Sequence, residues 1–259
     1  MRATCRRARP LLGTLVDVRA EGPEAEAAVA AAFDEIAAVQ ALLSFHTAHS
    51  ELQAINRAAP GTRLRVDPRT LTVLRLACTL HEASARAFDC RVGTPEQLAD
   101  TRFPVAFAGD VVDKQTQARM DLGGIAKGYA VDCAIETLRG FAVEDAVVNA
   151  GGDLRHHGTR PMRVQIRDPR NAARIAATVR LHNAALASST AGGLAAGLDT
   201  PSRIHNADRL ALPALAGATV QAPSCVLADA LTKIVLATGN AAHPLLAQYG
   251  AAVTVYSPG

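Results

Sequence analysis

The pattern of apolar and polar residues predicts a strand followed by a long helix at the start of the chain. Apolar and polar residues alternate over residues 14–19, as in a strand with one buried face. After Pro23 a stripe at helical spacing predicts an amphipathic helix. The stripe consists of Val29, Phe33, Ile36, Gln40 and Leu43, of which only Gln40 is polar.

Three further helices are predicted from their boundary residues. Asp67 and Pro68 form an N-cap followed by proline at the first helical position, so a helix should run to about residue 87. A second helix follows the glycine pair 123–124 and ends at Gly140. A third spans about 227–237 before Gly239. The inner face of the first should carry Leu71, Leu74, Cys78 and His81.

Short apolar runs at 146–148, 163–167, 176–181 and 251–256 predict strands. Helices and strands alternate irregularly, which favours an α+β fold over a repeated βαβ pattern. No linker long or polar enough to divide the chain is present, so residues 1–259 are predicted to form a single domain. The arginine-rich residues 1–10 are expected to be a short solvated tail.

Composition restricts the class of protein. Hydrophobic residues make up 49% of the chain and charged residues 20%, which is ordinary for a soluble globular protein. No apolar run approaches the roughly 18–20 residues that span a bilayer. Residues 1–7 are basic but are not followed by an apolar core, so they are not a signal peptide as written. The expected location is cytoplasmic, or periplasmic if a leader was removed.

The cysteines and the net charge exclude further classes. The five cysteines are scattered and form no CxxC pair, which argues against zinc ribbons and disulfide frameworks. A net charge of +3 without tryptophan gives no case for nucleic-acid binding. Of the 27 basic residues only three are lysines, and two of these, Lys127 and Lys233, lie within the densest motifs of the chain.

The strongest motif is DLGGIAKGYAVD at residues 121–132. Adjacent glycines before a helix allow a ligand to approach backbone N–H groups, and Lys127 adds a positive charge in the first helical turn. Together these features are typical of a phosphate-binding turn. The alternative is a tight strand-to-helix turn from which Lys127 reaches solvent. The segment matches neither a Walker A loop nor GxGxxG.

Three other segments carry polar groups whose roles stay open. Asn149 and Asp153 flank a glycine turn and can bind a nucleotide or cap their own turn. The hydroxyl-rich turn at 185–193 can contact phosphate but lacks GxSxG spacing. Asp229, near the start of a helix, is either an N-terminal cap or a ligand of a hard cation such as Mg²⁺. The histidines are dispersed and form no HExxH, so a zinc hydrolase has no support.

The order of these motifs resembles the ApbE-like family of FAD:protein FMN transferases. The two most specific blocks, residues 121–132 and VNAGGD at 148–153, match that family almost letter for letter. The other similar segments are LGT at 12–14, ELQAIN at 51–56, FDCRVG at 88–93, ALASS at 185–189 and ADAL at 228–231. The resemblance thus runs from residue 12 to about residue 239.

The resemblance implies a mixed, mainly antiparallel sheet with flanking helices, and an enzyme that transfers FMN from FAD. FMN would be attached through a phosphoester to a Thr or Ser hydroxyl of a flavoprotein, with release of AMP. Mg²⁺ would be held by the Asp229 carboxylate, the Ala126 carbonyl and the Thr232 hydroxyl. FAD would lie against Gly13, Thr14, Gly123, Gly124, Lys127, Asn149, Gly151, Gly152, Asp153, Ser188 and Ser189.

The chain also departs from the family pattern. The family's metal-binding hydroxyl lies four residues after the aspartate, where this chain has Lys233; Thr232 is one position early, which turns it by about 100° on a helix. An ammonium at Lys233 can take the place of the cation. In the block that carries the family's catalytic histidine, Arg203 stands at the histidine position, and His205 is the predicted substitute base.

Three functions follow as hypotheses. The first is an active Mg²⁺-dependent flavin transferase. The second is a relative that binds FAD or a nucleotide but has lost transfer and serves as a carrier or assembly factor. The third is a non-enzymatic scaffold, which the intact glycine blocks at 121–132 and 148–153 argue against. We predict the first.

Overall fold

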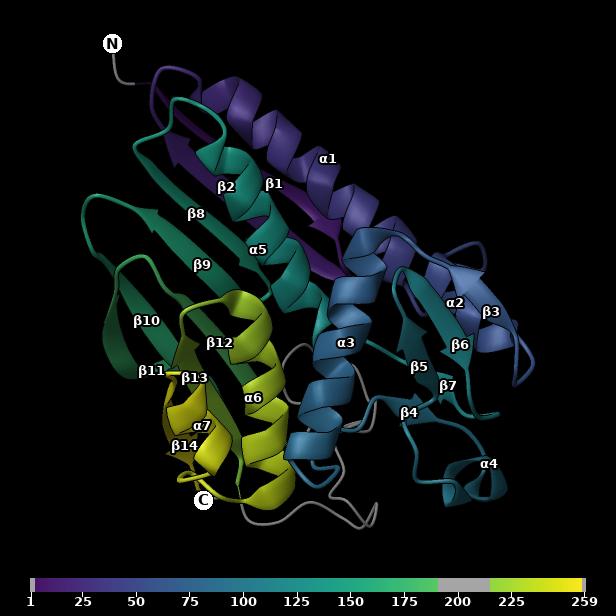
Figure 1. Ribbon diagram of the computed structural model, residues 1–259. Coiled ribbons are helices and arrows are strands. Elements are labelled where there is room, and N and C mark those ends of the chain that lie inside the picture. The colour runs from purple at the N-terminus through teal and green to yellow at the C-terminus, as the bar shows by residue number, and fades with distance from the viewer. Residues whose placement is uncertain (1–2, 191–214, 258–259) are drawn as a thin grey trace.

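The computed structural model describes residues 3–190 and 215–257, and its largest element is a seven-stranded sheet in which neighbouring strands are antiparallel (Figure 1). This confirms the predicted α+β class with a mainly antiparallel sheet. In spatial order the strands are β1 (Thr4–Leu11), β2 (Thr14–Glu21), β8 (Asp145–Ala150), β9 (Asp153–Gly158), β12 (Ala185–Thr190), β13 (Gly217–Ala222) and β14 (Ala252–Tyr256).

Three helices cover one face of this sheet and form the main core with it (Figure 1). They are α1 (Ala25–Leu43), α5 (Ala126–Arg139) and α6 (Cys225–Thr238). The apolar residues of the predicted α1 stripe are buried, including Phe33 and Ile36, which are 0% exposed. On α6, ten of the 14 residues are buried, which agrees with a helix that packs on a sheet with one face and on α5 with another.

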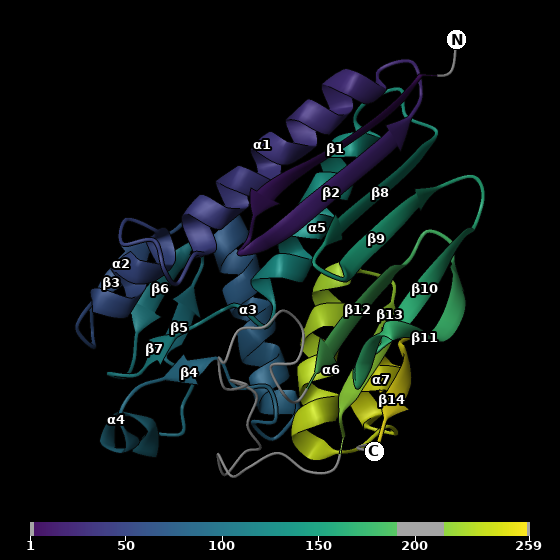
Figure 2. The same ribbon diagram turned by 180° about the vertical axis from the view of Figure 1, so that it is seen from behind.

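The opposite face of the sheet carries a hairpin of β10 (Met162–Asp168) and β11 (Asn171–Leu181), seen from behind in Figure 2. A small second core joins the hairpin to the sheet through Leu154, Ile166, Leu181 and Leu186. The helix α7 (Pro244–Gln248) leads into the edge strand β14. The large sheet is therefore covered by helices on one side and partly by a hairpin on the other.

A smaller region continues from the C-terminal end of α1 and lies beside α5 (Figures 1 and 2). Its helices are α2 (Glu51–Arg57), α3 (Pro68–Ala83) and α4 (Pro95–Ala99). Its strands are β3 (Arg63–Arg65), β6 (Val111–Lys114) and β5 (Val105–Ala108), which form one sheet in that order, and the pair β4 (Arg91–Val92) and β7 (Arg119–Met120).

Most of the predicted elements are present. The strands expected at 14–19, 146–148, 163–167, 176–181 and 251–256 are β2, β8, β10, β11 and β14. The helices expected after Pro23, after the glycine pair and at 227–237 are α1, α5 and α6. Gly239 ends α6 with a φ of 66°, the left-handed conformation that a C-terminal glycine commonly adopts.

The prediction of a solvated tail at residues 1–10 is wrong. Residues 4–11 form β1, which pairs along its whole length with β2. Its side chains are mostly exposed, so no alternation of apolar residues marks the strand in the sequence. Arg6 pairs with Asp17 at 3.0 Å, and the guanidinium of Arg9 lies 4.6 Å from the centre of the Phe33 ring. The arginines thus cover a sheet edge and a helix.

The helix that begins at Pro68 ends earlier than predicted, at Ala83. Ala85 and Arg86 have φ values of 49° and 70°, which terminate the helix and turn the chain back. The buried face is also shifted. Leu74 and His81 are buried as predicted, whereas Leu71 and Cys78 are only partly buried, and Val73, Ala77 and Leu80 complete the face.

The third lysine, Lys114, leads to a prediction about pH. Its side chain is 1% exposed and its ammonium donates to the Ala118 carbonyl at 2.6 Å. Burial lowers the pKa of Lys114 from 10.5 to about 8. Between these values the unfolded chain binds more protons than the folded one, so the free energy of unfolding should rise with pH by up to about 1.4 kcal/mol per unit.

Urea denaturation of the wild type and Lys114→Met at several pH values from neutral to alkaline measures this effect. The difference in unfolding free energy between the two proteins should increase in favour of the wild type as the pH rises through the Lys114 pKa. A difference that stays constant over that range would show that Lys114 does not titrate there.

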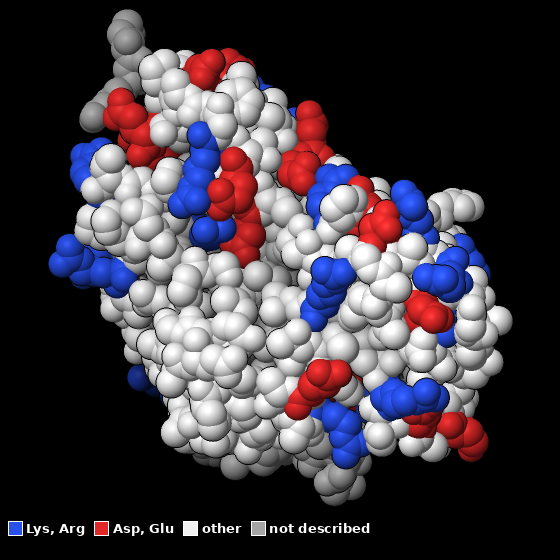
Figure 3. Space-filling model, in the orientation of Figure 1, with Lys and Arg blue, Asp and Glu red and all other residues white. Residues whose placement is uncertain are grey.

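Two surface features bear on the expected partners. In the part of the chain that is described, no helix is both long and apolar enough to cross a bilayer. On the face shown in Figure 3, basic and acidic side chains are interspersed over the upper and right-hand parts of the molecule. Many of these form ion pairs, such as Arg139 with Glu136 at 3.0 Å.

Candidate functional site

Two tight turns at one end of the sheet bring distant motifs together. Leu12 and Gly13 form the turn between β1 and β2, with φ values of 56° and 71°. The N–H of Leu12 donates to the side-chain oxygen of Gln40 at 2.5 Å, so the polar residue of the α1 stripe holds this turn. A Cβ at Gly151, whose φ is +63°, would lie 2.5 Å from the Thr14 hydroxyl. Gly151 lies in the second turn, between β8 and β9, and this turn therefore requires glycine at that position.

The second turn, between β8 and β9, is held by the side chain of Asn149. Its side-chain oxygen accepts the N–H of Gly152 at 2.9 Å. Asn149 thus caps its own turn, which is one of the two roles expected from the sequence; its contact with a nucleotide stays a prediction. Asp153, the next polar residue, is 1% exposed and points to α5, where its carboxylate pairs with the Lys127 ammonium. The two best-matched blocks of the sequence meet through this ion pair.

The N-terminal turns of α5 and α6 cap each other. Asp132, nearly two turns into α5, accepts the N–H groups of Cys225 and Val226 at 2.8 Å each. Asp229, one turn into α6, accepts the N–H of Gly128 at 3.2 Å. Neither helix has a side-chain cap from its own N-cap residue. Each carboxylate therefore satisfies donors of the other helix and lies at the positive end of its dipole.

This arrangement changes the capping interpretation of Asp229 that the sequence allowed. The residue does cap a helix, but the helix is α5 and not its own. The capping depends on close approach, because a Cβ on Gly128 would lie 2.4 Å from the Cys225 carbonyl oxygen and 2.9 Å from the Asp229 Cβ. Sequence analysis missed Asp132 as its counterpart, although that residue ends the block at 121–132.

Four charged residues form a compact group between these helix ends and β9, here termed the lysine–aspartate cluster: Lys127, Asp153, Asp229 and Lys233. The Lys127 ammonium pairs with Asp153 and lies 4.0 Å from an oxygen of Asp229. The Lys233 ammonium lies 2.5 Å from the other Asp229 oxygen. Both carboxylate oxygens of Asp229 thus face cations.

In the cluster, the lysine side chains are more exposed than the aspartate side chains. The side chain of Lys127 is 32% exposed and that of Lys233 is 17% exposed. The side chain of Asp153 is 2% exposed and that of Asp229 is fully buried. A ligand that approaches the cluster therefore meets positive charge, with the compensating carboxylates behind it. Such a surface favours an anion.

The pKa shifts follow from these contacts. Burial opposes the charge of Lys127, but the Asp229 and Asp153 carboxylates outweigh burial and raise the pKa of Lys127. Burial likewise opposes the charge of Asp229, but the two ammonium groups lower its pKa below the usual value. Burial and the neighbouring Asp229 raise the pKa of Asp153. The pair Asp229 and Lys127 is therefore ionised at neutral pH.

The Lys233 ammonium is surrounded by oxygen atoms. Besides Asp229 it donates to the Ser189 hydroxyl at 2.7 Å and the Thr232 hydroxyl at 3.1 Å. The backbone carbonyl of Asp229 lies 3.3 Å away. The Thr232 hydroxyl in turn donates to that carbonyl at 2.7 Å and pairs with Ser189 at 2.7 Å. The hydroxyls and the carboxylate thus form one connected network around Lys233.

The residues proposed for Mg²⁺ do not fit a divalent ion as they stand. Mg²⁺ binds oxygens at about 2.0–2.1 Å in a near-ideal octahedron. The oxygens of Asp229 and Thr232 that such an ion would use already accept hydrogen bonds from Lys233. Nowhere in residues 3–190 and 215–257 do three His, Cys, Asp or Glu side chains form a group that could hold a metal ion.

The backbone donors of the glycine turn are also largely engaged. The Gly123 N–H donates to Asp121 at 3.0 Å, the Ala126 N–H to the Leu122 carbonyl at 2.8 Å, and the Gly128 N–H to Asp229. The expected phosphate-binding turn with open N–H groups is therefore not what α5 presents. These three donors are therefore engaged within the chain, whereas the side chain of Lys127 is 32% exposed and that of Lys233 is 17% exposed.

The other predicted site residues divide into two groups. Five of them lie in the two turns or around the cluster: Gly13, Thr14, Gly124, Ser189 and Thr232. Ser188 points elsewhere and pairs with the Thr219 hydroxyl at 2.9 Å. Ser188 and Ser189 belong to β12 and not to a turn, which corrects the expectation. His205 and Arg203 lie outside the described residues. The FAD contacts themselves stay predictions.

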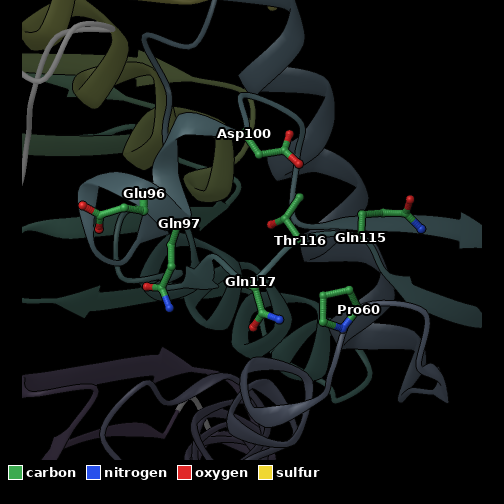
Figure 4. A pocket seen from close by; sticks show the side chains of 7 residues that line it. All are labelled: Pro60, Glu96, Gln97, Asp100, Gln115, Thr116 and Gln117. Atoms are coloured by element: carbon green, nitrogen blue, oxygen red, sulfur yellow. The ribbon is translucent and has the colours of Figure 1, made fainter.

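A separate hollow lies in the smaller region, lined by polar side chains (Figure 4). It has a volume of about 380 Å³ and contains no predicted site residue. Its lining residues are Pro60, Glu96, Gln97, Asp100, Gln115, Thr116 and Gln117. Two carboxylates and no cation line it, so it lacks the positive groups that a diphosphate would need. We place the candidate site at the lysine–aspartate cluster.

Comparison with known proteins identifies the family of the chain. The ApbE family matches residues 12–256. The chain therefore belongs to the ApbE family. A FAD:protein FMN transferase of Rhodobacter capsulatus is 34% identical over 190 residues, which cover 61% of this chain and 36% of that protein. One from Treponema pallidum is 26% identical over 181 residues, covering 57% of this chain and 50% of that protein. The chain thus spans half or less of these two relatives.

Solved structures confirm the fold. The apo form of the flavinyl transferase ApbE of Pseudomonas stutzeri superposes with a TM-score of 0.83 at 19% identity, covering 100% of this chain and 92% of that one. The flavin transferase ApbE of Vibrio cholerae gives a TM-score of 0.83 at 20% identity, covering 98% and 94%. At this identity the likeness establishes the fold alone.

Proposed function

We propose that this protein binds FAD at the lysine–aspartate cluster and transfers its FMN part to a protein hydroxyl. The observation that carries the proposal is the one-sided exposure of the cluster, in which the side chains of Lys127 and Lys233 are 32% and 17% exposed while both carboxylates are buried. The names of the relatives, FAD:protein FMN transferases, supply the chemical class of the anion. Two adjacent cations suit the diphosphate of FAD.

In the proposed reaction, the hydroxyl oxygen of a Thr or Ser in a flavoprotein forms a bond to the phosphorus of the FMN part. The bond from that phosphorus to the bridging oxygen breaks, and AMP leaves with this oxygen. The hydroxyl proton passes to a base, for which His205 remains the sequence prediction. Lys127 would hold the diphosphate, and the positive charge of Lys233 would help to compensate the charge that develops on it. No step runs through Mg²⁺, because Lys233 engages the oxygens that the ion would need.

A second candidate function is a family member that binds FAD without transferring FMN. Lys233 favours it, because the ammonium stands where the family resemblance places a metal ligand. A cation that is covalently part of the chain cannot bridge two phosphates in the way a divalent ion does. The two candidates share the binding site and differ only in the transfer step.

One experiment separates the two functions. The purified protein is incubated with FAD and flavoprotein acceptors, and the products are separated by denaturing electrophoresis with flavin fluorescence while AMP is measured by chromatography. Fluorescent acceptor and AMP in equal amounts support the transferase. FAD binding without either product supports the second candidate. Absence of FAD binding would contradict both.

The lysines of the chain provide a matched test of the binding site. Lys127→Met keeps the length of the side chain but removes one of the two exposed cations, so FAD affinity should fall by about tenfold or more. Lys114→Met removes a buried ammonium in β6, outside the cluster, and should leave FAD affinity unchanged. Calorimetric titration measures both. Equal affinities for Lys127→Met and the wild type would place FAD elsewhere.

A further inference from the structure

We infer that the Lys233 ammonium is a built-in cation that replaces the divalent metal at this site, so that FAD binds here without a divalent ion. The inference rests on the proposed function, because FAD must bind at the cluster. Its basis is the oxygen environment of Lys233, which includes a carboxylate, two hydroxyls and a carbonyl within 3.3 Å. These are the ligand types that a hard cation takes.

The hydrogen-bond geometry saturates the ammonium. An ammonium has three protons to donate, and the three closest acceptors are Asp229 at 2.5 Å, Ser189 at 2.7 Å and Thr232 at 3.1 Å. Ser189 and Thr232 lie on different elements, β12 and α6, and are held together by their own hydrogen bond. The position of the ammonium is therefore fixed by three groups rather than by one flexible ion pair.

The stem of Lys233 is held in place as well. A Cβ on Gly124 would lie 3.3 Å from Cγ and 3.6 Å from Cε of Lys233, so the side chain passes directly over the glycine turn. Because the ammonium lies 2.5 Å from the Asp229 carboxylate, a metal ion at about 2.0–2.1 Å from the same oxygen and on the same side would overlap with it. Lys233 would have to leave before such an ion bound.

The charge balance of the cluster also disfavours a divalent ion at this site. The cluster contains two carboxylates and two ammonium groups, so its buried negative charge is already compensated within the chain. A divalent ion placed between Lys127 and Lys233 would be repelled by both, whereas an anion would be attracted. The site thus accepts the diphosphate directly and disfavours the free cation.

The inference predicts that substitution of Lys233 creates a metal site. Lys233→Thr removes the ammonium and adds a hydroxyl beside Asp229, whereas Lys233→Met removes the charge but adds no oxygen. Mn²⁺ binding is measured by electron paramagnetic resonance, with FAD and without it, and FAD alone serves as the blank. We expect no bound Mn²⁺ in the wild type or in Lys233→Met, and one ion per chain in Lys233→Thr with FAD.

FAD affinity supplies a second readout. For Lys233→Thr it should fall about tenfold or more in EDTA and recover when Mg²⁺ is added. Mn²⁺ bound by the wild type in proportion to protein, and lost in Asp229→Asn, would overturn the inference without any Lys233 variant. A folded Lys233→Thr that binds no Mn²⁺ would overturn it too. Failure of every protein to bind FAD would instead contradict the proposed function. In that case, Mn²⁺ binding by the wild type without FAD still tests the role of Lys233.

Discussion

Asp229→Asn should lower the free energy of unfolding by about 3–5 kcal/mol, the range expected when one partner of a buried ion pair is removed. The Asp229 carboxylate is fully buried and faces Lys233 at 2.5 Å and Lys127 at 4.0 Å. After the substitution, Asp153 is the one carboxylate left in the cluster to balance the two ammonium groups. It also places an amide where the Gly128 N–H needs an acceptor.

Chemical denaturation of the wild type and Asp229→Asn measures this loss. Asp17→Asn is the matched control, because Asp17 pairs with Arg6 at 3.0 Å on the surface, where its side chain is 28% exposed. The control should change stability by at most about 1 kcal/mol. FAD affinity of Asp229→Asn should fall equally in EDTA and in Mg²⁺. Weakening confined to Mg²⁺ would show that Asp229 binds a metal instead.

Gly128→Ala should destabilise the protein by about 3 kcal/mol, even though alanine favours a helix over glycine by about 1 kcal/mol. The added Cβ would lie 2.4 Å from the Cys225 carbonyl oxygen and 2.7 Å from its carbon. These are backbone atoms of the first turn of α6, so the two helices must separate. Separation weakens both reciprocal caps, formed by Asp132 and Asp229.

Gly123→Ala is the control for this prediction, because Gly123 lies in the glycine turn just before α5. A Cβ there would meet only the Asp121 side chain, at 3.2 Å from its nearer oxygen, and a side chain can move. We expect a change below about 1 kcal/mol for the control. Thermal and urea unfolding compare the two variants. A Gly128→Ala protein as stable as the wild type would mean that the contact between α5 and α6 is looser than described.

The elements that the sequence predicted well carry a local signal. α1 buries an apolar stripe and β2 alternates, so periodicity was sufficient for these two. Glycines at the boundaries marked α5 and α6, and a short apolar run marked β8. The missed strands lack this signal. β1 is an edge strand with mostly exposed arginines, and β9 buries His156, which pairs with Asp145 at 3.3 Å. Polar residues that are satisfied by distant partners cannot be recognised as buried from local sequence.

The candidate site was only partly predictable for the same reason. Family motifs identified Lys127, Asp153 and Asp229, but not that the three meet in one ion cluster. The reciprocal capping by Asp132 and Asp229 joins residues about a hundred positions apart, which no local pattern reveals. The sequence did raise the alternative that Lys233 takes the place of the cation, because it occupies a position four residues after Asp229 on one helix.

A titration of the wild-type protein with FAD, in EDTA and in Mg²⁺, tests the central claim that this is a flavin site with its own cation. Calorimetry gives the dissociation constant under each condition. We predict two constants that agree within about twofold, a difference of less than 1 kcal/mol. Tight binding in Mg²⁺ that disappears in EDTA would contradict the claim, since it would show that a divalent ion displaces Lys233 from Asp229 when FAD binds.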